Sequence, residues 1–383
     1  MRDRYKLDLQ CGAYSAVRPL AGFPRLMGSL LIRHRAVSDE AHLQAAAGWL
    51  MEAQKAGGGG GFAHSYHLLR GWRPPYPETT GYIISTLHRL YRRTGDPALR
   101  ASVVAALTWL KSVQQVDGSF MDLQGRRQVF DTGQILIGLN YIAEHAPELR
   151  DEDMLARAAR WLELAQQEDG SFVVGAGNPV AHSYCARVGA ALAAAGRLLK
   201  EDRLQRAGHA NLCWTLAQQE PNGFFRHLSF DRSPPYLHTM IYVLEGLLDG
   251  YAEIRDPRLL VAAMRFAEPL LAVSRRDQML RSQYHSDFTI ANAQKCLTGL
   301  AQWADVCLRL ADLNKQNDYR GEALNAIHFL KRRQIQCGDR RLNGGLWGSD
   351  PLWGRYMRFA IPNWGVKFFM DALLTDRKSP TTA

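Results

Sequence analysis

The sequence predicts an all-α fold, an (α/α)6 toroid in which six outer and six inner helices alternate along the chain. Three observations support this fold class. A motif recurs with a period of about 50 residues. Each copy pairs a helix that has one polar face with a helix that is apolar on all sides. Long connections alternate with short ones. An open solenoid of helix pairs is the alternative, but its loops are typically shorter and more uniform.

The repeat is clearest in residues 106–120, 159–172 and 211–225. Each of these combines an apolar helix, a Gln-Gln pair and a glycine closely followed by an aromatic residue. Weaker copies are 47–62 and 327–347. A fifth pair lacks this turn, and we expect its outer helix at about 257–273 and its inner helix from about Phe288. Counting that pair, the chain contains six helical hairpins.

These hairpins predict one toroidal domain over residues 38–376, although 383 residues alone would suggest two or three domains. Residues 1–37 are expected to form an N-terminal arm and residues 377–383 a flexible C-terminal tail. The apolar stretch of the arm, within 25–35, is short, so we expect it to pack on the toroid rather than contact a membrane surface.

Composition narrows the function classes. Hydrophobic residues make up 46% and charged residues 22% of the chain, which excludes a disordered protein. No apolar run approaches the ~20 residues of a membrane span, so a cytoplasmic protein is predicted. The net charge is +10, but lysine and arginine are spread along the chain. This spread disfavours nucleic acid and favours an anionic substrate.

Polar residues open the predicted inner helices. All inner helices of a toroid start at the same end, so these residues are expected around one cleft, where the long loops also lie. They are Glu78, Asp131, His182, His238, Asn292 and Asn363.

Two carboxylates of this set, Glu78 and Asp131, lie on adjacent hairpins. Each is either an N-terminal helix acid or one member of a glycosidase acid–base pair. Their separation would then predict retention or inversion of the sugar configuration.

The two histidines suggest another reaction. His182 and His238 occupy equivalent repeat positions, and Tyr184 lies beside the first. Histidine and tyrosine are the pair that a lyase or C5-epimerase uses to remove the proton next to a uronate carboxylate. Arg226, Arg281, Asn292 or Lys367 could neutralise that carboxylate.

Aromatic and basic residues of the same loops and helix ends complete the candidate substrate site. Aromatic faces stack on sugar rings, although they also pin loops to a core. The additional residues are Trp72, Arg73, Tyr82, Tyr236, Arg355 and Trp364.

No metal or cofactor is expected. Asp131, His182 and His238 could converge, but the chain has no helical i,i+4 histidine pair and no CxxC motif to support a metal site. The six dispersed cysteines fit a reducing compartment.

The Gln-x-x-x-Gly-x-aromatic turns resemble the QW-type repeats of terpenoid cyclase and protein prenyltransferase toroids. The DxDD acid motif of the cyclases and the Asp-x-Cys pair of the zinc prenyltransferases have no counterpart here. Residues 71–87 also resemble toroid proteins encoded among bacterial exopolysaccharide and surface-glycan genes, which implies a role in polysaccharide production or modification.

The predicted function is therefore a carbohydrate-active enzyme of bacterial polysaccharide biosynthesis that acts on an acidic, uronate-containing glycan. The reaction is either C5 proton abstraction by an epimerase or lyase, or glycosidic hydrolysis. A non-catalytic glycan-binding or scaffold protein is the alternative from another class, and a terpenoid cyclase-like enzyme ranks third.

Overall fold

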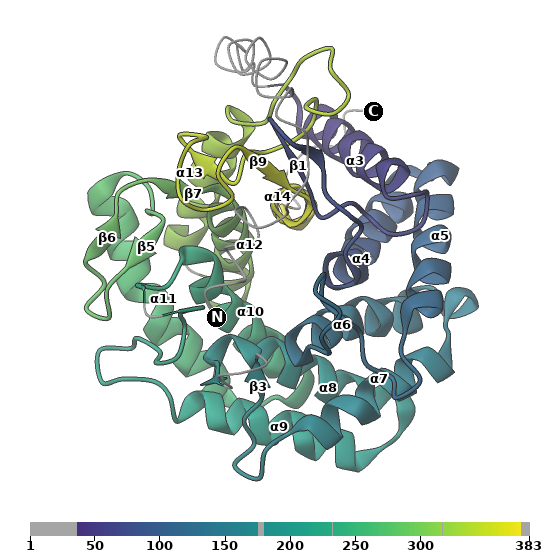
Figure 1. Cartoon of the computed structure of the whole chain (residues 1–383). Coiled ribbons are helices and arrows are strands. Elements are labelled where there is room, and N and C mark those ends of the chain that lie inside the picture. The colour runs from purple at the N-terminus through teal and green to yellow at the C-terminus, as the bar shows by residue number, and fades with distance from the viewer. Residues whose placement is uncertain (1–36, 175–179, 232, 316, 377–383) are drawn as a thin grey trace.

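The computed structural model describes residues 37–174, 180–231, 233–315 and 317–376. Within these ranges, twelve α-helices alternate between an outer and an inner ring around one axis (Figure 1). The inner helices pack side by side, and the last of them contacts the first, so the ring is closed. This confirms the predicted (α/α)6 toroid. Except for Val37, the predicted arm and tail lie outside the described residues.

Four of the outer helices begin directly after a polar N-cap residue. The side chains of Ser38, Asp96, Asp151 and Asp256 each accept a hydrogen bond from the first turn of an outer helix. The outer helices are α3 (Asp39–Ala56), α5 (Pro97–Val113), α7 (Glu152–Ala165), α9 (Asp202–Leu216), α11 (Pro257–Asp277) and α13 (Asn317–Lys331).

The inner ring consists of helices that are buried on nearly every side, as their composition predicts. They are α4 (Pro77–Thr94), α6 (Val129–His145), α8 (Ala186–Leu199), α10 (Leu237–Ile254), α12 (Leu297–Asn314) and α14 (Asn363–Thr375). Two short 3-10 helices, η1 (Pro147–Leu149) and η2 (Ser183–Cys185), precede α7 and α8.

A glutamine side chain links most neighbouring outer helices. In the third hairpin, Gln166 Nε2 donates to the carbonyl of Gly170 in its own turn and to that of Ala207 on the next outer helix, at 3.0 and 2.8 Å. Equivalent pairs of bonds come from Gln54, Gln114, Gln219 and Gln334. Gln334 lies just after the last outer helix and bonds to His42 on the first, so the same contact also closes the ring.

The glycine of the turn allows this close approach. Gly118 has φ +94° and Gly170 has φ +86°, a backbone region that side chains disfavour. A Cβ at Gly118 would also lie 2.3 Å from the Arg157 carbonyl oxygen of the next outer helix. The aromatic residue that follows, Phe120 or Phe172, is fully buried. The motif therefore joins a turn to the neighbouring hairpin.

The fifth hairpin departs from the prediction. Its inner helix starts at Leu297, not near Phe288, and the intervening residues form β5 (Gln283–Tyr284), β6 (Ile290–Asn292) and β7 (Lys295–Cys296). Phe288 has φ +63° in the turn between β5 and β6, which is incompatible with a continuing helix. Ser274 Oγ donates to the Glu322 carboxylate of the next outer helix at 2.5 Å, so a different bond links α11 to α13.

Short strands tie the rim loops together. β1 (Ser65–His67) pairs with β2 (Gly71–Trp72) and with β9 (Ala360–Pro362), which joins the first hairpin to the last. β7 pairs with β8 (Ser349–Asp350), and β3 (Val173–Val174) pairs with β4 (Val180–Ala181). These strands lie in the long loops, so they hold the rim at the N-terminal ends of the inner helices.

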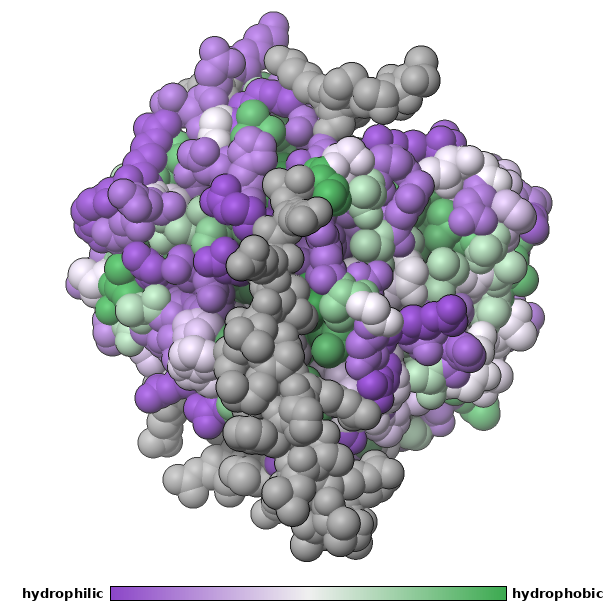
Figure 2. Space-filling view, turned by 90° about the horizontal axis from the view of Figure 1, so that it is seen from above, coloured by the Kyte–Doolittle hydropathy of each residue, from purple (hydrophilic) through white to green (hydrophobic). Residues whose placement is uncertain are grey.

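Hydrophilic side chains predominate among the described residues on the face that Figure 2 shows, with smaller hydrophobic areas between them. Among the described residues, no helix combines the length and apolar character that crossing a membrane requires.

Replacing the linking glutamine should destabilise the fold. We expect Gln166→Ala to lower the free energy of unfolding by about 1–3 kcal/mol, because two hydrogen bonds to the buried Gly170 and Ala207 carbonyls are lost. Asn211 Nδ2 still donates to the Gly170 carbonyl. The matched control is Gln167→Ala, since Gln167 is exposed and its amide makes only a long bond within the same turn. Equal urea midpoints for the two variants would contradict the linking role.

Candidate functional site

A central cavity of about 210 Å³ opens among the rim loops and the N-terminal ends of inner helices. Its walls come from α4, α10 and α14, from the β1–β2 hairpin and from the loop before β9. Six of the predicted site residues line it: Arg73, Glu78, Tyr82, His238, Arg355 and Trp364. The cavity therefore brings together residues that are almost 300 positions apart in the chain.

Glu78 lies in the first turn of α4, where a carboxylate is favoured by the helix dipole. One turn further, Tyr82 is buried. Burial raises the pKa of Tyr82 well above its usual value, and Tyr242 and the Glu78 carboxylate add to that shift. Burial and then Glu78 have the same effect on the pKa of Tyr242. Both phenols are consequently protonated and can donate hydrogen bonds.

His238 opens α10 and is 5% exposed. Its Nδ1 lies 2.7 Å from Gln302 Oε1 on α12, and its ring packs 4.3 Å from the Tyr242 ring. Burial lowers the pKa of His238 to about 3; the Gln302 bond opposes this shift and Arg187 adds to it. The imidazole is therefore neutral at physiological pH.

Asp131 does not line the cavity. It is fully buried in the first turn of α6 and accepts a hydrogen bond of 2.5 Å from the Tyr76 hydroxyl. Tyr76 itself lines the cavity, so it stands between the Asp131 carboxylate and that space. Glu78 and Asp131 thus occupy different environments, one at the cavity wall and one behind it.

His182 and Tyr184 lie apart from His238. Their rings stack on each other at 4.6 Å, and Tyr184 packs edge-on against Phe130. His182 Nδ1 lies 3.2 Å from the His227 carbonyl oxygen, a bond that ties two rim loops together. Neither residue lines the central cavity. Their contacts are those of residues that hold loops in place.

Arginine side chains surround the cavity opening. Arg70, Arg73 and Arg355 all line it, and neither Arg73 nor Arg355 forms an ion pair with another residue in the described part of the chain. His64 lies beside them, against the rings of Tyr76 and Trp364. Burial, followed by the charge of Arg73, lowers the pKa of His64 to about 3. The opening is therefore basic.

Two of the predicted aromatic residues support the cavity from outside. Trp72 packs against Trp49 and Tyr66, with ring centroids 5.3 and 5.0 Å away. Tyr236 packs 5.3 Å from Tyr356. Trp364, by contrast, lines the cavity, and its Nε1 donates to the Tyr356 hydroxyl at 2.8 Å.

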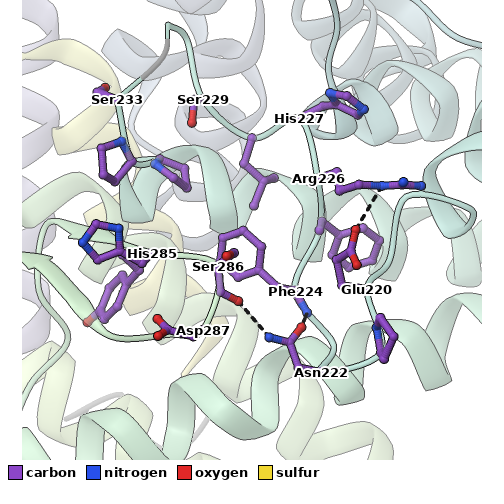
Figure 3. A pocket seen from close by; sticks show the side chains of 16 residues that line it. Glu220, Asn222, Phe224, Arg226, His227, Ser229, Ser233, His285, Ser286 and Asp287 are labelled. Atoms are coloured by element: carbon purple, nitrogen blue, oxygen red, sulfur yellow. Dashed lines mark hydrogen bonds and ion pairs between the residues drawn. The ribbon is translucent and has the colours of Figure 1, made fainter.

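Arg226 faces a second hollow, an open groove between the loop after α9 and the β5–β6 turn (Figure 3). Its guanidinium pairs with Glu220 at 3.2 Å, and Asn222 reaches across to the Ser286 carbonyl at 2.8 Å. These contacts are drawn as dashed lines in Figure 3. Arg226 therefore does not contribute to the central cavity.

Three further residues that we expected to bind a carboxylate lie elsewhere. Asn292 is in β6, where it bonds to Gln283 at 3.1 Å, because the inner helix that it was expected to open starts later. Arg281 lies in the loop before β5. Lys367 is buried in α14, where its ammonium pairs with Asp371 at 2.6 Å and lies 5.0 Å from the Tyr82 ring centroid.

Sequence reasoning missed a set of buried polar groups beneath the cavity. Arg187 pairs with Glu245, and Gln302 Nε2 donates to Glu245 Oε2 at 3.1 Å. A charged residue within a helix that is apolar on all sides was the available signal, since such a charge needs a buried partner. No group of three histidine, cysteine or acidic residues that could hold a metal occurs among the described residues.

The central region of the chain matches a known family model. The model for the squalene-hopene cyclase C-terminal domain covers residues 72–227. This match confirms the resemblance to terpenoid-cyclase toroids that the repeated turns indicated. A search of curated proteins finds no match to the sequence.

Solved structures share the fold over most of its length. An unsaturated glucuronyl hydrolase specific for heparin aligns with a TM-score of 0.70 and 16% identity, over 88% of this chain and 96% of the other. A cellobiose 2-epimerase from Bacillus thermoamylovorans B4167 aligns with a TM-score of 0.67 and 10% identity, over 87% of this chain and 99% of the other. A D-mannose isomerase aligns with a TM-score of 0.66 and 13% identity, over 95% of this chain and 99% of the other. At these identities the likeness shows a common toroidal fold.

The depressed pKa of His238 predicts acid sensitivity. Unfolding restores an ordinary histidine pKa near 6.5, so between about pH 3 and 6.5 the unfolded chain binds a proton that the folded chain does not. Stability should therefore fall as the pH falls below 6.5.

We expect His238→Gln to reduce this fall. Between pH 7 and 4.5 the wild-type protein should lose up to about 2–3 kcal/mol more unfolding free energy than the variant, as measured by urea denaturation at each pH. Parallel stability curves for the two proteins would show that His238 is not buried in its neutral form.

Proposed function

We propose that the protein is a carbohydrate-active enzyme that moves a proton at the carbon next to the carboxylate of a uronate sugar. The observation that carries this proposal is the joint presence of His238, Tyr242 and Glu78 at one cavity that is also lined by Arg73 and Arg355, neither of which forms an ion pair within the described part of the chain. The sugar-converting activities named for the structurally similar hydrolase, epimerase and isomerase support the substrate class.

Each group has a role in this proposal. Arg73 and Arg355 bind the sugar carboxylate and withdraw charge from it, which acidifies the neighbouring C–H. His238 accepts that proton on Nε2, and the electron pair of the C–H bond moves into the carboxylate as an enolate. The bound anion raises the His238 pKa, which strengthens the base only when substrate is present.

The second step decides the product. In epimerisation, the protonated phenol of Tyr242 or Tyr82 gives a proton to the same carbon from the opposite face, and solvent exchange then restores the phenol and the imidazole. In elimination, the electron pair instead forms a double bond between C4 and C5 and expels the oxygen on C4, which takes a proton from the phenol of Tyr242 or Tyr82 as it leaves. Burial, with a smaller contribution from the Glu78 charge, raises the pKa of both phenols, so both carry their protons before the reaction.

Hydrolysis ranks lower because it requires two carboxylates that both reach the substrate. Asp131 is fully buried behind Tyr76, and Asp122 at the cavity is occupied by a 2.8 Å ion pair with Arg126. A terpenoid cyclase would require an apolar cavity, whereas this one contains three arginines and a glutamate.

Deuterium exchange tests the reaction. With uronate-containing oligosaccharides in D2O, the wild-type protein should either introduce deuterium at C5 by epimerisation or form a C4–C5 unsaturated uronate by elimination, and His238→Gln should slow the reaction by at least about a hundredfold. The matched control is His182→Gln, because His182 lies just before an inner helix but outside the cavity. If the protein instead hydrolyses the glycan without C5 exchange, and Asp131→Asn abolishes this hydrolysis, the protein is a glycosidase.

Replacing Arg355, which lines the cavity, tests whether the protein binds an anionic sugar. Arg355→Gln should weaken binding of a uronate oligosaccharide by about tenfold at low salt, because one charge-assisted contact of about 1.5 kcal/mol is lost. Arg226→Gln is the control, since Arg226 is paired with Glu220 in the outer groove. Calorimetric titration should show no such loss with the neutral sugar. Equal losses in both variants would point to a general charge effect.

A further inference from the structure

A chain of buried polar side chains runs beneath the cavity from three neighbouring inner helices. Arg187 comes from α8, Glu245 and His238 from α10, and Gln302 from α12; none is more than 5% exposed. Their contacts follow one another: Arg187 pairs with Glu245, Gln302 Nε2 donates to Glu245 at 3.1 Å, and Gln302 Oε1 faces His238 Nδ1 at 2.7 Å.

The ion pair at one end of this chain determines the orientation of the amide. Burial raises the pKa of Glu245 to about 7, and the charge of its partner Arg187 opposes this rise, so at pH 8 the carboxylate is ionised and can only accept hydrogen bonds. Gln302 must therefore turn its NH2 group toward Glu245. Its carbonyl oxygen is then the only atom that it can present to His238.

The amide in turn determines which nitrogen of His238 carries the proton. A neutral imidazole has one N–H and one lone pair, and a carbonyl oxygen can only accept. Nδ1 must therefore be the protonated nitrogen. Nε2 retains its lone pair, and because His238 lines the cavity, this lone pair is available to a bound molecule.

The far end of the chain is also held in place. Arg187 Nε donates to Gln134 Oε1 on α6 at 2.8 Å, and the guanidinium lies 4.9 Å from the centroid of the Tyr242 ring. Arg187 consequently has a fixed position between two inner helices, and Glu245 cannot rotate away from it without losing a buried charge partner.

We propose that Gln302 is a positioning residue, oriented by the Glu245–Arg187 ion pair, that holds His238 as the Nδ1–H tautomer and leaves Nε2 as the acceptor in the cavity. The tautomer itself depends only on these contacts. Its kinetic consequence rests on the proposed function, in which Nε2 takes the substrate proton.

Nitrogen-15 NMR of histidine-labelled protein tests the tautomer without substrate. The His238 signals are assigned from their disappearance in His238→Gln. At pH 8, where the Glu245 carboxylate is ionised, Nδ1 of the wild-type protein should show the shift of a protonated nitrogen and Nε2 that of an unprotonated one. An Nε2–H tautomer in the wild-type protein would overturn the proposal.

Gln302→Met tests the positioning residue, because methionine has similar length but no carbonyl acceptor. We expect the Nδ1–H form to lose its preference by about five- to tenfold, which appears as averaged nitrogen shifts. The value of kcat should fall by a similar factor, with KM little changed. Gln134→Met is the matched control, since it alters the same buried chain without touching Gln302, and its His238 shifts should remain those of the wild type.

The outcomes separate the two proposals. Unchanged nitrogen shifts in Gln302→Met would refute the positioning role, whatever the activity. The expected shifts together with neither C5 exchange nor an unsaturated product from uronates would sustain the tautomer and refute the proposed reaction.

Discussion

The side-chain amide that joins neighbouring outer helices is the contact on which the ring depends. One NH2 group bonds a carbonyl of its own turn and a carbonyl of the next hairpin, as Gln114 does with Gly118 and Met154. Because the same amide bonds to the turn and to a carbonyl within the neighbouring helix α7, it fixes the spacing between hairpins. Gln334 makes the same contact with His42, so the last and first outer helices are joined by the same kind of hydrogen bond as neighbouring helices within the ring.

This closed ring places all inner helices in parallel and therefore gathers their N-terminal ends on one rim. The long loops then lie above these ends, where short strand pairs such as β1 with β9 hold them. Partial positive charge at the helix ends adds to the arginines of the loops. A basic, loop-covered cavity is thus a consequence of the architecture, and its chemistry depends on which side chains occupy the first turns.

The axis of the toroid is polar as well as close-packed. The Arg187–Glu245 and Lys367–Asp371 pairs lie within helices that otherwise bury apolar residues. Each cation also faces a tyrosine ring, Arg187 that of Tyr242 and Lys367 that of Tyr82. Burying such ion pairs costs desolvation free energy, so they contribute more to a specific arrangement of the side chains than to the stability of the fold. Here they orient the groups at the cavity floor, which an apolar axis could not do.

The sequence by itself determined the helical hairpins, their number and the rim at which the cavity opens, because periodicity and turn residues act locally. It also placed Glu78 and His238 correctly at helix starts. Tertiary structure alone decided that Asp131 would be covered by Tyr76, that His182 would bond a loop carbonyl and that Asn292 would fall in a strand. These outcomes depend on side chains from other hairpins. The similar sequence positions of His182, just before η2, and His238, in the first turn of α10, contain no information about which neighbours close over each one.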